Sequence, residues 1–162
     1  MKEMDVRLER LTTMRAVRTH ALSETPEEDA GKKIRAWALS KGLTAKNGYR
    51  LFGRNMYPTD KPEPHGYELY LTINDAVEFD GDVELGEIPG GLYAVLRFKN
   101  LDRIGAAWKK LWTWLEESAY EPLGWIKGSH GWVDGFEEHI NWQAEEKLVT
   151  EWVFDLWVQI KT

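Results

Sequence analysis

The chain has 162 residues, 43% hydrophobic and 30% charged, with a formal net charge of −6. These values are typical of one globular domain and argue against a nucleic-acid surface, which needs clustered lysine and arginine. No apolar run approaches the roughly 20 residues of a membrane span, and no apolar signal segment begins the chain. Because cysteine is absent as well, we expect a cytoplasmic protein without disulfides or cysteine-based metal sites.

Nine tryptophans are more than the packing of a core this size requires. We therefore expect some of them to line a cavity or a surface patch. The stretch Gly131–Trp142 interleaves aromatic residues with acids: Trp132 precedes the adjacent carboxylates Glu137 and Glu138, which His139 follows. Carboxylates are usually solvated and tryptophans usually buried. Their mixture here indicates an aromatic-walled place that contains an acid.

The first half of the chain predicts a strand that turns into a second strand or strand half, followed by a helix and two further strands. Alternating apolar and polar residues indicate the strands. The segment S-E-T-P-E-E-D-A indicates a helix start, with Thr25 as N-cap and Pro26 in the first position. In chain order, the predicted elements are strands Val6–Leu11 and Met14–Leu22, a helix from Pro26 to about Gly42, strand Gly48–Tyr57 with a bend at Gly53, and strand Tyr67–Ile73.

The second half repeats this order. Asn100 is the expected N-cap of a long helix that carries several tryptophans. The predicted elements are strands Val83–Ile88 and Leu92–Phe98, a helix Leu101–Ser118, a strand with a loop in Gly131–Trp142, and a final strand Phe154–Ile160.

Short matches in the same order relate the two halves. V-R-L-E-R-L at 6 matches V-E-L-G-E-I at 83, M-R-A-V-R-T-H at 14 matches L-Y-A-V-L-R-F at 92, and Y-E-L-Y-L-T-I at 67 matches F-D-L-W-V-Q-I at 154. They predict a single domain, 1–162, with repeats of about 4–76 and 81–162. The predicted fold is α+β: duplicated strand-helix-strand-strand units form an antiparallel sheet with both helices on one face and a ligand cavity at the pseudo-twofold junction.

Strand alternation assigns side chains to the two sheet faces. Tyr67, Leu69, Leu71 and Ile73 should pack on the helices. Their neighbours should turn away from the helices, together with the matching residues of the last strand: Glu68, Tyr70, Thr72, Asp155, Trp157 and Gln159. This second face is either solvated, as in many half-buried sheets, or the wall of a cavity.

The sequence does not contain the residue patterns that several kinds of site require. The four histidines form no i,i+4 pair and no H-E-x-x-H motif, so no metal or other cofactor is expected. No G-x-S-x-G elbow or phosphate-binding glycine loop is present. A carboxylate among aromatic residues remains, and it has two possible uses: pairing with a flat organic cation, or general acid–base chemistry after desolvation raises its pKa. Trp108 and Trp112 fit either the core or this site.

Motifs along nearly the whole chain resemble the GyrI-like small-molecule-binding domain, the effector-binding module of multidrug-sensing transcription activators. They are V-R-L-E-R-L-T-T-M-R-A-V-R, R-L-F-G, G-Y-E-L-Y-L-T-I, I-P-G-G-L-Y-A-V-L-R-F, A-W-K-K-L-W-T-W-L-E-E-S-A-Y, F-E-E-H-I-N and F-D-L-W-V-Q-I-K. The chain shows no helix-turn-helix ahead of them, so it resembles the stand-alone members. The resemblance implies a duplicated fold with a ligand cavity.

The resemblance also implies binding of bulky aromatic, often cationic compounds by a buried glutamate in a Glu-x-Tyr context. E-E-H at 137–139 matches with Glu137 as the acid and His139 in the tyrosine place. Strand alternation admits only one of the two glutamates, and a shift by one residue would select Glu138. Some members of the family hydrolyse cyclopropane-bearing DNA-alkylating compounds.

The leading hypothesis is a cytoplasmic binder of hydrophobic, preferably cationic aromatic molecules, with Glu137 as the charge partner. The other expected ligand-binding residues are Tyr70, Tyr93, Trp112, Trp132, His139, Trp152 and Trp157, and the alternative acids are Glu138 and Glu68. A second hypothesis is a hydrolase that uses Glu137, and a third is a protein-interaction or enzyme-inhibitor module. Direct nucleic-acid or membrane binding is not expected, and the sequence predicts neither the ligand nor the oligomeric state.

Overall fold

The computed structural model describes residues 5–55, 65–75, 77–78, 81, 83–123, 135–142 and 148–162, with only the backbone of His65. The chain divides into two compact units. Unit 1 consists of Met1–Thr12 and Gly90–Thr162, and unit 2 is Thr13–Pro89. Each unit contains four antiparallel strands and one α-helix among its described residues. No helix in those residues is long and apolar enough to cross a membrane.

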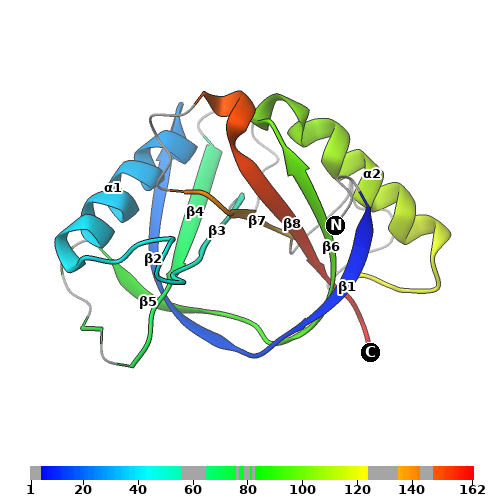
Figure 1. Ribbon diagram of the computed structural model, residues 1–162, viewed down its shortest axis with the longest axis horizontal. Coiled ribbons are helices and arrows are strands. Elements are labelled where there is room, and N and C mark those ends of the chain that lie inside the picture. The colour runs from blue at the N-terminus through cyan, green and yellow to red at the C-terminus, as the bar shows by residue number, and fades with distance from the viewer. Residues whose placement is uncertain are drawn as a thin grey trace. The chain divides into compact units, whose positions relative to one another are not determined.

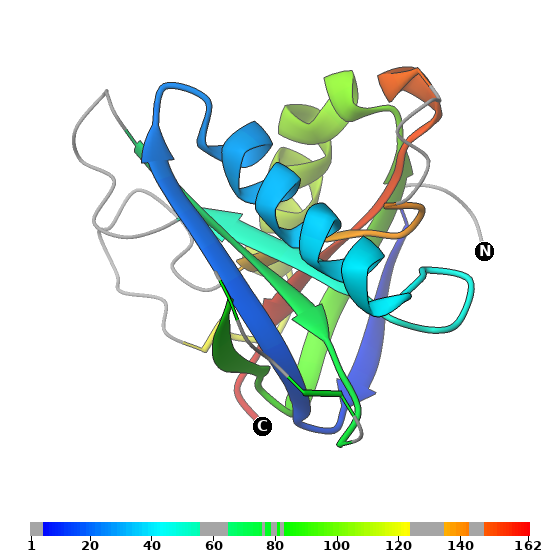
Figure 2. The ribbon, with the colours of Figure 1, turned by 90° about the vertical axis from the view of Figure 1, so that its left-hand side faces the viewer.

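Unit 2 is a continuous segment of the chain. Its sheet has the order β5-β2-β4-β3, and α1 lies across β2 and β4 (Figure 2). The elements are β2 Met14–Ser23, α1 Pro26–Lys41, β3 Leu51–Asn55, β4 His65–Thr72 and β5 Glu84–Ile88. The predicted strand Gly48–Tyr57 is therefore shorter at its start, and its last two residues lie outside the described part.

The ends of α1 follow their predicted signals. Pro26 occupies the first turn, and Thr25 is the N-cap residue, although its side chain makes no capping hydrogen bond. Gly42 ends the helix in the left-handed conformation, with φ of 70°, which glycine adopts without strain. Ile34 and Trp37 are buried on the side that faces the sheet.

Unit 1 joins the first strand of the chain to the second half. Its sheet has the order β1-β6-β8-β7 (Figure 1). The elements are β1 Val6–Leu11, β6 Gly91–Lys99, the 3-10 turn η1 Leu101–Arg103, α2 Ile104–Glu117, β7 Gly135–His139, the 3-10 turn η2 Val149–Glu151 and β8 Val153–Gln159. Residues 131–134 of the predicted strand with a loop lie outside the described part.

The predicted helix Leu101–Ser118 is divided at its start. The Asn100 side chain accepts a hydrogen bond from the backbone N–H of Asp102 at 3.0 Å, and its own φ is 85°. A 3-10 turn follows this cap, and the α-helix begins at Ile104. Such a tight turn at a helix N-terminus is common.

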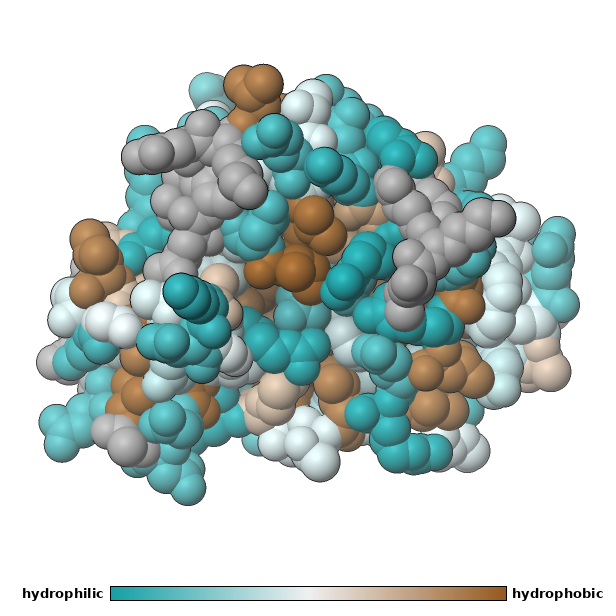
Figure 3. Space-filling view, viewed as in Figure 1, coloured by the Kyte–Doolittle hydropathy of each residue, from teal (hydrophilic) through white to brown (hydrophobic). Residues whose placement is uncertain are grey.

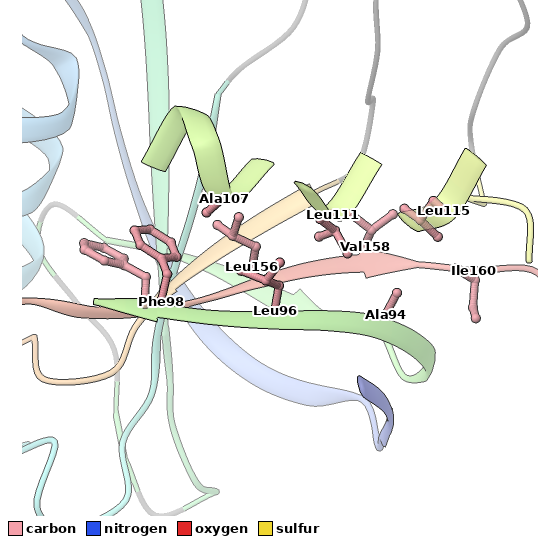
Figure 4. Close-up of a cluster of buried hydrophobic side chains, with 10 residues drawn as sticks. Ala94, Leu96, Phe98, Ala107, Leu111, Leu115, Leu156, Val158 and Ile160 are labelled. Atoms are coloured by element: carbon pink, nitrogen blue, oxygen red, sulfur yellow. The ribbon is translucent and has the colours of Figure 1, made fainter. Parts of the chain in front are cut away.

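The core of unit 1 lies between α2 and the sheet. Every second residue of β6 and β8 points toward α2. These apolar side chains pack against the apolar face of the helix, which repeats every 3.6 residues. Figure 4 shows most of these side chains between the helix and the strands. The cluster contains Ala94, Leu96, Phe98, Ala107, Leu111, Leu115, Phe154, Leu156, Val158 and Ile160, all buried.

The first strand of each predicted repeat pairs with a strand of the other repeat. β1 pairs with β6, and β5 pairs with β2. The compact units therefore divide the chain differently from the predicted repeats, about 4–76 and 81–162. The same strand order in both units fits a duplication, which stays a prediction. The ligand cavity expected at the junction of the repeats stays a prediction as well.

Candidate ligand-binding site

The face of the unit 1 sheet that points away from α2, here called the distal face of unit 1, gathers aromatic and charged side chains. Directly paired residues share a face, so Phe136 lies with Trp157, and Glu138 lies with Asp155. Pairing of β6 with β8 and with β1 adds Tyr93, Val95, Arg97, Arg7 and Glu9. The predicted orientation of Asp155, Trp157 and Gln159 is thus confirmed.

Trp157 is the aromatic centre of this face. It is 1% exposed and meets Tyr93, which is fully buried, edge to face: the ring centroids are 5.6 Å apart and the planes form an angle of 81°. Phe136, on the neighbouring strand, stands directly opposite Trp157. Edge-to-face pairs are a favoured arrangement of aromatic rings. The structure therefore brings together two of the predicted ligand-binding residues, Tyr93 and Trp157.

The acid beside Trp157 is Glu138. Trp157 Nε1 donates a hydrogen bond to Glu138 Oε1 over 3.0 Å, and Glu138 is 4% exposed. The two residues are diagonal neighbours on adjacent strands. A buried carboxylate needs hydrogen-bond donors, and the indole N–H is one of them. The aromatic ring and the carboxylate are thereby held in a fixed relation.

A second buried acid, Asp155, lies directly between Glu138 and Arg97 on the sheet. Arg97 donates to both of its carboxylate oxygens, over 2.9 and 3.0 Å, and Arg7 Nη2 donates to Oδ2 over 2.9 Å. The hydrogen bonds to Asp155 raise the pKa of the Arg97 guanidinium above its ordinary value, so it remains charged. Asp155 and its two arginines therefore form an ion-pair cluster.

Glu137, the acid preferred from the resemblance, points to the opposite face of β7, and its part in ligand binding stays a prediction. Glu137 lies on the helix side of β7, where Trp108 Nε1 of α2 donates to its Oε2 over 2.8 Å. The pairing of Glu138 with Asp155 fixes this register, because neighbouring residues of a strand point to opposite faces. The alternative acid, Glu138, is the one on the distal face with Trp157. Apart from this register, nothing in the sequence E-E-H tells which of the two glutamates points to which face.

Three further predicted site residues also lie on the helix side. His139 stacks on Phe154 of the core, with ring centroids 4.7 Å apart, and contacts Trp152 at 4.9 Å. Trp112 and Trp152 pack against the core cluster of unit 1. Within the described residues, the buried indole nitrogens of these two tryptophans have no hydrogen-bond partner. Trp132 lies outside the described residues.

In unit 2, Glu68 and Tyr70 face away from α1 as predicted, whereas Thr19 of the neighbouring strand points toward α1 and donates to the Ala30 carbonyl. Arg18 Nε and Arg54 Nε donate to Glu68 over 2.6 and 2.5 Å, and the Tyr70 hydroxyl donates to it over 3.0 Å.

Two opposing effects act on the Glu68 carboxyl. Burial raises its pKa, but hydrogen bonds from Arg54 and Arg18, and their charges, outweigh burial and hold the pKa below its ordinary value. Glu68 is thus an ionised member of an ion-pair cluster, and the structure places it with Tyr70.

Several aromatic side chains of the two units are buried, among them Tyr93, Trp157 and Phe52. Figure 3 shows one face of the molecule, on which the apolar side chains of described residues form separate small groups among hydrophilic ones. Exposed large apolar residues such as Leu22 and Leu39 are scattered. Within the described residues, no group of three or more histidine, aspartate and glutamate side chains could hold a metal ion.

The fold is shared with solved structures. The C-terminal domain of EcmrR has a TM-score of 0.75 at 15% identity, with 98% of each chain covered. A hydrolase encoded by lin2189 from Listeria innocua has a TM-score of 0.67 at 10% identity, covering 98% of this chain and 93% of that one. SAV2435 bound to tetraphenylphosphonium has a TM-score of 0.50 at 11% identity, covering 97% and 94%. These identities establish the fold alone.

The family to which the chain belongs is one of small-molecule-binding domains. The family model "GyrI-like small molecule binding domain" matches residues 4–161, so the chain belongs to the GyrI-like family. The predicted family and fold class are confirmed. The chain spans 57% of the EcmrR chain in its complex with DNA. No curated protein matches the chain.

Proposed function

We propose that this domain binds hydrophobic, cationic aromatic small molecules at the distal face of unit 1. Glu138 supplies the negative charge, and Trp157, Tyr93 and Phe136 supply the aromatic surface. The observation that carries the proposal is the hydrogen bond from the Trp157 indole to the buried Glu138 carboxylate. It favours Glu138 over Glu137, the charge partner that the sequence led us to expect.

The physical basis is that this pair offers two attractions to one ligand. The face of an indole ring attracts cations, and flat ligands stack on it. A carboxylate at 4% exposure acts in a medium of lower dielectric than water, where its attraction for a cation is stronger. An uncharged aromatic compound would gain only the first attraction. Selectivity for cations should therefore depend on Glu138.

The comparisons support this class of ligand. SAV2435, which shares the fold, is bound to tetraphenylphosphonium in its solved structure. That ion is a permanent cation that carries four phenyl rings. A ligand of this kind fits a carboxylate that is surrounded by aromatic side chains, and the family is one of small-molecule-binding domains.

Titration with the ethyl ester of rhodamine B, a fluorescent aromatic cation, tests the proposal. Glu138→Gln keeps the shape and an acceptor for Trp157 but removes the charge, and it should weaken binding about tenfold or more, as expected for a charge-assisted contact. Glu137→Gln is the matched control, because it removes the same charge from the helix side, and its affinity should stay within about twofold. Unchanged affinity in Glu138→Gln would reject the role of Glu138 as the charge partner. Weaker binding in Glu137→Gln alone would assign that role to Glu137.

Hydrolysis is the second candidate function. It is favoured by the buried carboxylate beside an aromatic wall, which could donate or accept a proton, and a relative of the same fold is called a hydrolase. Incubation with a cyclopropane-bearing alkylating compound should then give a product heavier by one water, and Glu138→Gln should abolish it. Recovery of the intact compound after long incubation with wild type would contradict this function.

A further inference from the structure

Arg97 extends the candidate site across the sheet. Three adjacent strands place Glu138, Asp155 and Arg97 side by side, with Asp155 paired to both of the others. Neighbouring strands are about 4.8 Å apart. The backbones of Glu138 and Arg97 are therefore separated by roughly 10 Å, a distance comparable with the width of a fused aromatic ring system.

The Arg97 side chain is held in one orientation. Its Nε and Nη2 donate to the two oxygens of Asp155, over 2.9 and 3.0 Å, and Asp155 is only 2% exposed. The side chain of Arg97 is nevertheless 43% exposed. Within the part of the chain that the structure describes, its remaining terminal nitrogen, Nη1, has no hydrogen-bond partner. Asp155 thus fixes a guanidinium group that still has an accessible edge.

A fixed guanidinium is a strong donor to carboxylates and carbonyls. Its planar donors match a carboxylate, and little entropy is lost when the group is already oriented. Arg7 also binds Asp155, so the acid carries two cationic neighbours. The line of side chains therefore runs from a carboxylate at Glu138 to a guanidinium at Arg97.

We propose that Arg97 is a specificity-determining residue that binds an acceptor group of the ligand, so that the domain prefers zwitterionic aromatic compounds to simple aromatic cations. The cationic end of such a ligand lies near Glu138, and its carboxylate lies near the Nη1 edge of Arg97. This assignment rests on the function proposed for Glu138 and Trp157.

Rhodamine B and its ethyl ester are a matched pair of probes. They share the cationic ring system, but only rhodamine B has a free carboxylate. Wild type should bind rhodamine B more tightly than the ester. Arg97→Gln should weaken binding of rhodamine B about tenfold and leave the ester unchanged or more tightly bound, because a repelling positive charge is removed.

Arg10→Gln is the control for the change of charge. Arg10 is exposed on β1, and its partner on β6 is Leu92, on the helix side of the same sheet. Both dyes should bind this variant within about twofold of wild type. Arg97→Lys, which keeps the charge and a contact to Asp155, should retain the fold and lose only part of the affinity for rhodamine B. Thermal unfolding of each variant checks its fold.

The absolute affinity for rhodamine B decides the inference. If Arg97 only repelled cations, its removal would strengthen binding of the ester without weakening that of rhodamine B, and the proposed contact would be rejected. If Glu138→Gln weakens binding of both dyes while Arg97→Gln and Arg97→Lys leave the affinity for rhodamine B unchanged, only the role assigned to Arg97 fails. If neither dye binds, or neither responds to Glu138→Gln, the proposed function fails with it.

Discussion

The indole nitrogen of Trp157 lies 3.0 Å from Oε1 of Glu138, and both side chains are almost fully buried. One residue comes from β8 and the other from β7, so the hydrogen bond crosses two strands diagonally. The orientation of the carboxylate therefore depends on the aromatic residue beside it. A substitution of either residue should alter both the stability of unit 1 and its ligand binding.

Trp157→Phe should destabilise the protein by about 1–3 kcal/mol, the usual loss when one hydrogen bond to a buried carboxylate is removed. The substitution keeps an aromatic ring but removes the donor to Glu138. Urea unfolding followed by circular dichroism measures the change. Trp114→Phe is the control, since Trp114 stacks on the exposed Tyr120, and it should cost less. Equal costs for the two substitutions would contradict the role of the hydrogen bond.

Asp155→Asn should destabilise the protein by about 3–5 kcal/mol, because two arginines then lose their buried carboxylate. Glu121→Gln breaks an exposed pair with Lys161, 3.3 Å apart and 72% and 55% exposed, and should change stability by less than about 1 kcal/mol. Denaturant midpoints of the two variants test the difference. A loss for Asp155→Asn as small as that for Glu121→Gln would show that the cluster contributes little.

Stability should depend on pH through Glu68. Its folded pKa lies below the ordinary value, mainly because burial is outweighed by hydrogen bonds from Arg54 and Arg18. The carboxylate therefore stabilises the fold above the unfolded pKa of about 4.3, and this contribution is lost as the pH falls through the folded pKa. Wild type should be more stable than Glu68→Gln at pH about 7, and the difference should shrink in acid. Thermal unfolding across this pH range measures it, and a constant difference would contradict the expectation.

Gly135 should not tolerate a side chain. A Cβ there would lie 2.6 Å from the ring of Trp108, so Gly135→Ala should cost about 1–3 kcal/mol through overpacking. Gly105, in α2, has open space around the same atom, and Gly105→Ala should stabilise the helix by up to about 1 kcal/mol. Thermal unfolding compares the two. A stabilising Gly135→Ala would show that Trp108 moves aside without cost.

Much of the fold is predictable from local patterns. The alternation in Tyr67–Ile73 and Phe154–Ile160 places Glu68, Tyr70 and Trp157 on the correct face, because strand period alone decides it. The helix signals around Pro26 are equally local. The choice of strand partners depends on residues far apart in the sequence. No feature of β1 or β5 indicates that each pairs with a strand of the other predicted repeat.

The choice between Glu137 and Glu138 required the register of β7 against β8. A shift by one residue turns every side chain to the other face, and E-E-H offers an acid in either register. A shift by one residue also concerns the comparison of the two halves. The match of M-R-A-V-R-T-H with L-Y-A-V-L-R-F makes Ala16 equivalent to Ala94. The match of Y-E-L-Y-L-T-I with F-D-L-W-V-Q-I makes Thr72 equivalent to Gln159. The strand partners of these two residues are Ala16 and Tyr93. Strand pairing therefore makes Tyr93, and not Ala94, the equivalent of Ala16.

The exchange of first strands has a consequence for synthesis on the ribosome. Unit 2, Thr13–Pro89, is one uninterrupted segment, so its sheet can be completed while the second half of the chain is still being translated. β1 is translated before unit 2, yet its partner β6 ends only at Lys99. β1 therefore lacks its partner strand until unit 2 has been translated, and a ribosome stalled before β6 holds a chain in which the sheet of unit 1 has not yet begun to form.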